Sequence, residues 1–261
     1  MNKNDIVEKV RDYLLENYNE TFHQYLGKSS VLLSGSTGWG IPEGSDINAD
    51  WDLHVILDDD LHERYMSDFD PSCTIDDHSH HPSVFVQIRP LSWLKKRLDG
   101  IDTSVLYLWI YENGTWICDS LGIANLVEEH RKLFENNLEN IAIKHFVNFS
   151  VRRLDASSSA KRGLKCATGI YRGSMVEAAL RSFCIAKSSP YPYGKWLSKQ
   201  TEILGEEGVS LVTLCEKCLF EQDVQKLPSL YKQLRIVMEG HMIEKFGESR
   251  WISHWWEYNE N

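Results

Sequence analysis

The spacing of apolar side chains divides the sequence into a mixed first half and a helical second half. Up to residue 122, short apolar runs alternate with helical periodicity, whereas beyond it apolar residues recur three and four apart with few strand signals. The pattern predicts helices over residues 5–26, 58–65, 93–98, 103–111, 125–154, 158–187, 195–204, 210–220 and 223–246, with a serine turn at 157–159. It predicts strands over residues 30–33, 53–57, 83–89 and 115–118.

This order of elements predicts two domains. Residues 1–122 are expected to form an α/β domain with a small mixed sheet flanked by helices, and residues 123–261 an all-helical domain. The segment Asp119 to Gly122 interrupts the apolar pattern and marks the expected boundary. A chain of 261 residues is long enough for two modest domains.

Composition indicates a globular protein without a membrane span. Apolar residues make up 42% of the chain and charged residues 25%, and no apolar run approaches the roughly 18 residues that a span requires. The N-terminal stretch alternates charged and apolar residues, which is typical of an amphipathic helix rather than a secretory signal. The six cysteines are scattered, as in reduced proteins. We therefore expect a cytoplasmic location.

The charge balance narrows the class of partner. The formal net charge is −10, which disfavours nucleic acid because broad phosphate binding depends on an excess of Lys and Arg. A small or cationic molecule fits an acidic protein better. The oligomeric state is left open between a monomer and a homodimer.

One strand–turn–strand stretch carries the candidate chemistry. The first predicted strand runs into Gly35 and Ser36, and a glycine-rich loop then leads to Asp50, Trp51 and Asp52 at the start of the next strand. Because side chains alternate along a strand, Asp50 and Asp52 should share one face while Trp51 enters the core. Two neighbouring carboxylates repel each other unless a hard cation lies between them, and Mg²⁺ accepts one or two carboxylates together with substrate phosphates. The pair is therefore a candidate magnesium site.

The turn before the loop is a candidate phosphate site. Gly35 has no side chain, so the backbone can approach a phosphate closely. Ser36 offers a hydroxyl and the start of a short helix, whose free N–H groups favour anions. One strand end thus supplies phosphate contacts and the next supplies metal ligands.

Gly-Ser, thirteen residues and then Asp-x-Asp resembles the signature of the DNA polymerase beta-like nucleotidyltransferase superfamily. Relatives with a helical second domain include the aminoglycoside nucleotidyltransferases, known from antibiotic resistance. The resemblance implies that Asp50 and Asp52 hold Mg²⁺ and that Gly35 and Ser36 hold the phosphates of ATP or another nucleoside triphosphate. It implies transfer of a nucleoside monophosphate to a hydroxyl of a small, aminoglycoside-like acceptor, with release of pyrophosphate.

A second register of the motif is possible. Asp46 and Asn48 also lie at a spacing that the superfamily uses. We prefer Asp50 and Asp52, because Asn48 would replace a carboxylate with a neutral amide and because the apolar strand begins only after Asp52.

The third strand departs from the family pattern. Many superfamily members carry a third carboxylate there, as metal ligand or general base, whereas this chain has Phe85, Gln87 and Arg89. In the second half, the helix that contains Glu177 and the following stretch Ser188 to Leu197 (SSPYPYGKWL) resemble the helical domain of aminoglycoside-type relatives, but more loosely than the first motif does. On that resemblance Glu177 is the candidate base, although it also reads as an exposed helical Glu. Lys195 either assists a nucleotide phosphate or covers Trp196 with its stem.

Three other features have competing interpretations. Cys215 and Cys218 read as buried thiols on one helical face more readily than as half of a zinc site. Residues 67–82 are predicted as a turn-rich loop, and the histidines and aspartates at 76–81 within it favour a solvated loop over a metal site. The tryptophan-rich segment 250–256 favours packing or a dimer contact over stacking on a base.

Two alternative functions remain open. One is a toxin-type nucleotidyltransferase that acts on a protein hydroxyl or a tRNA end, although the acidic balance argues against tRNA. The other is a catalytically silent nucleotide-binding module, which is suggested by Gln87 in place of a carboxylate.

Overall fold

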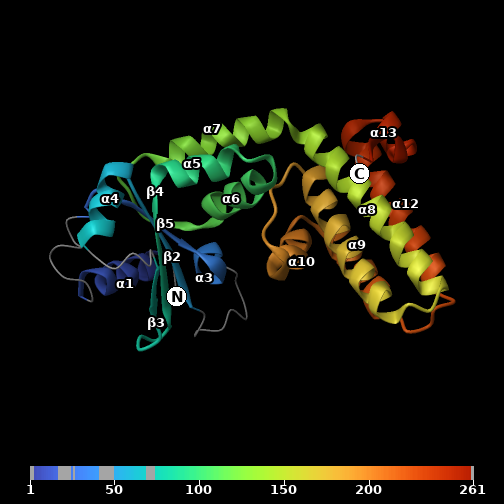
Figure 1. Ribbon diagram of the computed structural model, residues 1–261, viewed down its shortest axis with the longest axis horizontal. Helices are drawn as coiled ribbons and strands as arrows, with labels where there is room; N and C mark the ends of the chain where they lie inside the picture. Colours follow the sequence, from blue (N-terminus) through green and yellow to red (C-terminus); the bar gives the residue numbers. More distant parts are fainter. Residues whose placement is uncertain (1–2, 17–24, 26, 41–49, 69–73, 260–261) are drawn as a thin grey trace. The chain divides into compact units, whose positions relative to one another are not determined.

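The structure, a computed structural model, describes residues 3–16, 25, 27–40, 50–68 and 74–259 (Figure 1). It divides into two compact units, Met1–Lys132 and Leu133–Asn261. The first contains a small mixed sheet with helices, and the described part of the second contains helices without strands. The predicted fold class, an α/β unit followed by a helical unit, is therefore confirmed.

The first unit is organised around a five-stranded sheet in the order β3-β4-β2-β1-β5. β2 and β4 are parallel and the other neighbours are antiparallel, which makes the sheet mixed. One strand was not expected: β3 lies in a segment predicted as a turn-rich loop, and its polar sequence lacks the apolar alternation that marks a strand. The strands are β1 (Ser30–Ser34), β2 (Trp51–Leu57), β3 (Thr74–Asp77), β4 (Val84–Pro90) and β5 (Thr115–Asp119).

Helices cover both faces of this sheet (Figure 1). Trp51, Leu53 and Val55 alternate onto one face, where they pack with Val10 and Tyr13 of α1 in a common core. The placement of Trp51 in the core is as the sequence predicted. The helices of this unit are α1 (Lys3–Glu16), the five-residue α3 (Gly35–Trp39), α4 (Asp59–Asp68), α5 (Leu91–Asp99) and α6 (Ile101–Asn113).

A carboxylate joins the end of β5 to the helix that follows. Asp119 accepts hydrogen bonds from the Ser30 hydroxyl at 2.5 Å and from the backbone N–H groups of Ile123 and Ala124 at 2.8 and 2.9 Å. Burial raises the pKa of Asp119, but these hydrogen bonds outweigh that effect and the pKa is lowered overall. The ionised form is therefore favoured by folding.

Replacing Asp119 with Ala should lower the free energy of unfolding by about 1 kcal/mol at pH 7, because the first N–H groups of α7 (Ile123–Asn136) lose their acceptor. A carboxylate whose pKa is lowered on folding stabilises the protein above its unfolded pKa and ceases to do so as pH falls through the folded value. The difference in free energy of unfolding between the parent and Asp119→Ala should thus shrink below about pH 4. Urea unfolding from pH 7 to pH 2 measures it, with the exposed Asp12→Ala as control; a deficit that grows toward low pH would contradict the assignment.

The second unit is built from long helices, and its turns differ from those expected. α8 continues through the serines at 157–159 to Lys161, and the turn lies instead at Gly163, whose φ of +70° suits glycine. The expected helix 125–154 breaks at Asn137 into two. The helices after β5 are α7 (Ile123–Asn136), most of which belongs to the first unit, and α8 (Leu138–Lys161), α9 (Lys165–Ala186), α10 (Gly194–Ile203), α11 (Glu206–Phe220), α12 (Leu227–Phe246), α13 (Arg250–Ser253) and a 3₁₀ turn (Trp255–Tyr258).

The aromatic C-terminal segment packs partly onto this unit. Trp251 is buried, its indole N–H donates to Glu139 at 3.0 Å, and its ring meets Phe146 edge-on. Trp256 remains 56% exposed. These contacts favour a packing role for Trp251.

The two cysteines of α11 are buried. Cys215 and Cys218 are both buried in α11, and burial raises the pKa of each thiol, so both are protonated at neutral pH. This environment suits buried thiols rather than zinc ligands.

Among the described residues, no helix is long and apolar enough to cross a membrane.

Candidate functional site

The Gly-Ser turn and the second aspartate of the motif lie side by side. β1 ends at Ser34, which is the antiparallel partner of Asp52 on β2, and α3 begins at the next residue, Gly35. The Ser34 hydroxyl donates to the backbone carbonyl of Asp52 at 3.1 Å. The sheet register thus holds the start of the turn against the carboxylate-bearing strand.

Gly35 allows the carboxylate of Asp52 to lie directly against the turn. Its φ is +66°, a conformation that side chains disfavour, and a Cβ built at this position would collide with Oδ2 of Asp52. The space that a side chain would take is therefore filled by the aspartate. The group that approaches Gly35 here is a carboxylate, and the approach of a phosphate to this turn stays a prediction.

Neighbouring groups hold the short α3 turn in place. Thr115 of β5 is buried, and its hydroxyl donates to the carbonyl of Gly38 at 2.8 Å. The Thr37 hydroxyl reaches the carbonyl of Asp50 at 3.4 Å, and Trp39 meets Trp109 of α6 edge-on with centroids 4.9 Å apart. The sequence analysis did not single out Thr115, because only the β1–β5 pairing brings it to the turn.

The two aspartates differ in exposure. Asp50 is exposed and immediately precedes β2, whereas Asp52 is half-buried within it. Trp51 between them is 4% exposed and faces the opposite side of the sheet. Aspartate carboxylates are hard oxygen ligands of the kind that Mg²⁺ accepts. The alternative register, Asp46 and Asn48, lies outside the described residues.

The sheet register shows which side chains share the face of Asp52. Its partner on β4 is Phe85, and the partner of Phe85 on β3 is Asp76, so the three lie in one row on one face. Gln87 lies in the next row, beside His54. With strands about 4.8 Å apart, the Cα atoms of Asp76 and Asp52 are about 10 Å apart.

Asp76, which the sequence analysis assigned to a solvated loop, is therefore a carboxylate near the motif. It is exposed and forms an ion pair with His78 at 3.2 Å. The next residue, Asp77, is fixed differently: hydrogen bonds from Ser79 and Tyr13 lower its pKa to about 2. No apolar alternation marks β3, so only the observed pairing with β4 reveals that Asp76 shares a face with Asp52.

A buried polar pair lies beneath the site on the same face. His54 of β2 is 9% exposed, and its Nδ1 shares a hydrogen bond of 3.3 Å with the hydroxyl of Tyr111. Burial, reinforced by the positive charge of Arg89, lowers the pKa of His54 to about 4. His54 is thus neutral at physiological pH and is held by α6 rather than open to a ligand.

The two candidates from the second unit already have partners there. Glu177 of α9 is ion-paired with Arg181 one turn later, and its side chain is 47% exposed. The Lys195 ammonium lies 5.5 Å from the centre of the Tyr193 ring and 5.4 Å from that of Trp196. The lysine therefore covers aromatic rings, which was one of its two expected roles.

No protein-family model and no curated protein matches the sequence. Among solved structures, the chain is similar to a nucleotidyltransferase-like protein from Exiguobacterium sibiricum 255-15, with 13% identity, a TM-score of 0.48, and coverage of 92% of this chain and 78% of that one. At this level the likeness by itself assigns neither a family nor an activity.

Proposed function

We propose that the protein is a Mg²⁺-dependent nucleotidyltransferase. The observation that carries the proposal is the placement of the Asp52 carboxylate directly against Gly35, with Asp50 two residues away and Ser36 next in the turn. Carboxylates next to the start of a short turn at one strand end are groups that a divalent cation and a triphosphate would need. Asp50 and Asp52 would hold Mg²⁺, which would supply positive charge to offset the negative charge that develops in the reaction.

The residues of the chain have separate roles in this proposal. Asp50 and Asp52 hold the cation, and Gly35 and Ser36 bind the β- and γ-phosphates of ATP or another nucleoside triphosphate. Lys195 would assist a phosphate by leaving its aromatic neighbours. The reaction is attack of an acceptor hydroxyl on the α-phosphorus, which forms a new phosphate ester and breaks the bond to pyrophosphate.

The acceptor proposed first is a small, cationic, aminoglycoside-like molecule, because the protein carries a net charge of −10. A protein or tRNA acceptor is the second possibility. An assay of pyrophosphate release from ATP in the presence of Mg²⁺, with aminoglycosides and aminocyclitols as acceptors, tests the small-molecule acceptor. Pyrophosphate release only with a protein or tRNA fraction would show that the acceptor is a macromolecule. Binding of Mg-ATP without turnover on any acceptor would indicate a catalytically silent nucleotide-binding module.

Two carboxylates are candidates for the general base. Glu177 is the candidate from the loose resemblance, and its pairing with Arg181 means that it must be freed to accept a proton. Asp76 is the carboxylate that shares the sheet face of Asp52. We propose Glu177 as the base and treat Asp76 as its competitor.

Replacing Glu177 with Gln should lower kcat by about 10²- to 10⁴-fold, the contribution of a positioned base, without changing nucleotide affinity. Single-turnover kinetics and equilibrium binding of the nucleotide separate the two effects. The exposed Glu216→Gln serves as control. If Glu177→Gln keeps its kcat while Asp76→Asn loses it, the base is Asp76.

A further inference from the structure

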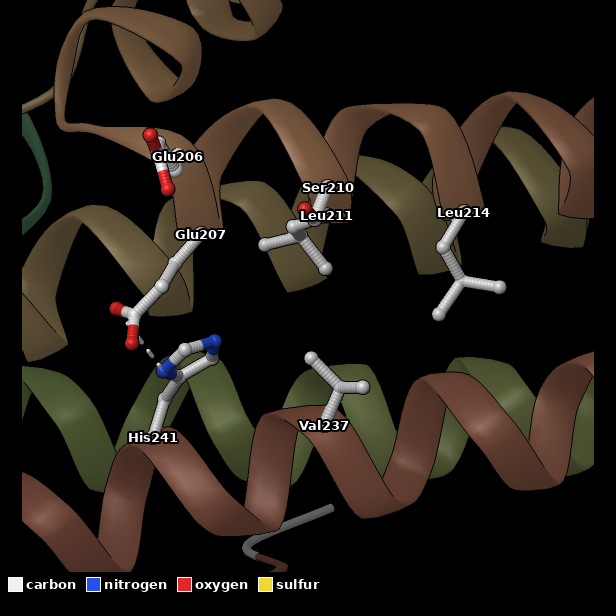
Figure 2. A pocket seen from close by; sticks show the side chains of 7 residues that line it. All are labelled: Glu206, Glu207, Ser210, Leu211, Leu214, Val237 and His241. Atoms are coloured by element: carbon white, nitrogen blue, oxygen red, sulfur yellow. Dashed lines mark ion pairs between the residues drawn. The ribbon is translucent and has the colours of Figure 1, made fainter.

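Three helices of the second unit bring a histidine, two carboxylates and a lysine together, far along the chain from the aspartate motif. Glu207 lies in the first turn of α11, His241 and Glu244 lie on α12, and Lys187 follows α9. Figure 2 shows Glu207 and His241 reaching toward each other from facing helices. Nothing in the proposed nucleotidyl transfer uses this group, which we call the His241 cluster.

The spacing of the donors suits a metal ion. His241 and Glu244 are three residues apart, which places both on one face of α12, and Glu207 faces them from α11. The Nδ1 of His241 lies 3.8 Å from a carboxylate oxygen of Glu244 and 4.0 Å from one of Glu207. A tetrahedral zinc site with bonds of about 2.0 to 2.1 Å needs donors about 3.4 Å apart. Small rotations of the two exposed carboxylate side chains would bring the donor atoms to that separation.

The histidine is held in place by packing beside the two carboxylates. The side chain of His241 is 12% exposed and its ring packs edge-on against Phe183, with centroids 4.8 Å apart. This burial is the largest influence on the pKa of His241 and lowers it. This packing fixes the ring with its Nδ1 toward the carboxylates of Glu207 and Glu244.

A lysine now occupies the place of a cation. The Lys187 ammonium lies 2.6 Å from Glu207 and 3.7 Å from Glu244. One ammonium beside two carboxylates leaves a net negative charge when the imidazole is neutral, whereas a divalent ion would balance both carboxylates. Lys187 is long and partly exposed, so it can move aside and then competes with a metal rather than excluding it.

A hollow beside the cluster leaves room for the remaining ligand. It has a volume of about 370 Å³ and lies between α11 and α12, with Glu207 and His241 at one end and Leu211, Leu214 and Val237 along it (Figure 2). Three protein ligands with an adjacent open space match the arrangement in which a water completes the shell.

We propose that Glu207, His241 and Glu244 form a binding site for Zn²⁺ or a similar divalent transition metal, with Lys187 as the internal competitor. The metal would link the start of α11 to the C-terminal half of α12 and stabilise the helical unit. The proposal does not depend on nucleotidyl transfer.

Zinc titration of the full-length protein against a chromophoric chelator tests this site. His241→Ala and Glu244→Gln should each weaken binding by at least about 10- to 100-fold, the loss seen for groups that support a metal ligand. Lys187→Met should tighten binding by about tenfold, because a like charge leaves the site. His254→Ala, an exposed histidine of the same unit, is the matched control and should bind as the parent does.

Cobalt spectroscopy separates this site from adventitious binding to the exposed Cys166. A site of one imidazole and two carboxylates gives d–d bands without thiolate charge transfer. That spectrum, lost in His241→Ala, supports the proposal. Zinc affinity that is equal in the parent and in both ligand variants, unchanged by Lys187→Met, or accompanied by thiolate charge transfer would overturn it.

Discussion

Replacing Asp52 with Asn should abolish Mg²⁺-dependent turnover while leaving the fold intact. Asn has nearly the same shape, so the contact with Gly35 and the β1–β2 pairing persist, but the neutral amide no longer offsets the charge of a divalent cation. Metal assistance contributes several kcal/mol to such reactions, which corresponds to a loss of about 10³-fold or more in kcat. Pyrophosphate release across a magnesium titration measures the effect.

One control variant and one variant of the second proposed ligand are compared with Asp52→Asn. Asp60→Asn removes an exposed carboxylate of α4 in the same unit and should leave kcat unchanged. Asp50→Asn should resemble Asp52→Asn. If Asp52→Asn and Asp50→Asn both remained active, the metal assignment would be wrong and the register at Asp46 would become the one to examine.

Replacing Gly35 with Ala should damage both the turn and the site. A φ of +66° costs a non-glycine residue about 1 to 2 kcal/mol. In addition, the new Cβ collides with the carboxylate of Asp52, so either the turn or the aspartate must shift. A displaced ligand of about 1 Å is enough to cost about 10²-fold in rate. We expect a lower free energy of unfolding together with weaker magnesium binding and a lower kcat.

Gly163 provides a matched control. Its φ is +70°, nearly that of Gly35, but an added Cβ would meet nothing within 4 Å. Gly163→Ala should therefore show the backbone cost in chemical denaturation without a loss of magnesium affinity. Equal kinetic effects of the two substitutions would mean that the contact between Gly35 and Asp52 has no functional role.

The strand–turn–strand stretch could be predicted because its information is local. The apolar runs before Gly35 and after Asp52 specify the strands, and alternation alone places Trp51 in the core. The fold class followed in the same way, since helical and strand periods differ clearly between the two halves of the chain.

The supporting contacts could not be predicted, because they depend on pairing between distant segments. Thr115 lies 77 residues from the Gly38 carbonyl that it contacts, and only the register of β5 against β1 brings them together. Asp76 shares a face with Asp52 through two successive strand pairings, and β3 itself has no apolar pattern. Long-range register leaves no local signal in a single sequence.

The misplaced helical turn has a different cause. The serines at 157–159 favour a turn by composition, but they lie within a long helix that is held by its buried face, and tertiary packing overrides such weak local preferences. The turn occurs where Gly163 provides a left-handed conformation.

The most direct test of the central claim is mass spectrometry of acceptors incubated with the protein, ATP and Mg²⁺. The account predicts an acceptor whose mass has increased by one nucleoside monophosphate less water, formed together with pyrophosphate and absent with Asp52→Asn. A product formed equally by the parent and by Asp52→Asn would contradict it, as would hydrolysis of ATP to ADP and phosphate without any nucleotidylated acceptor.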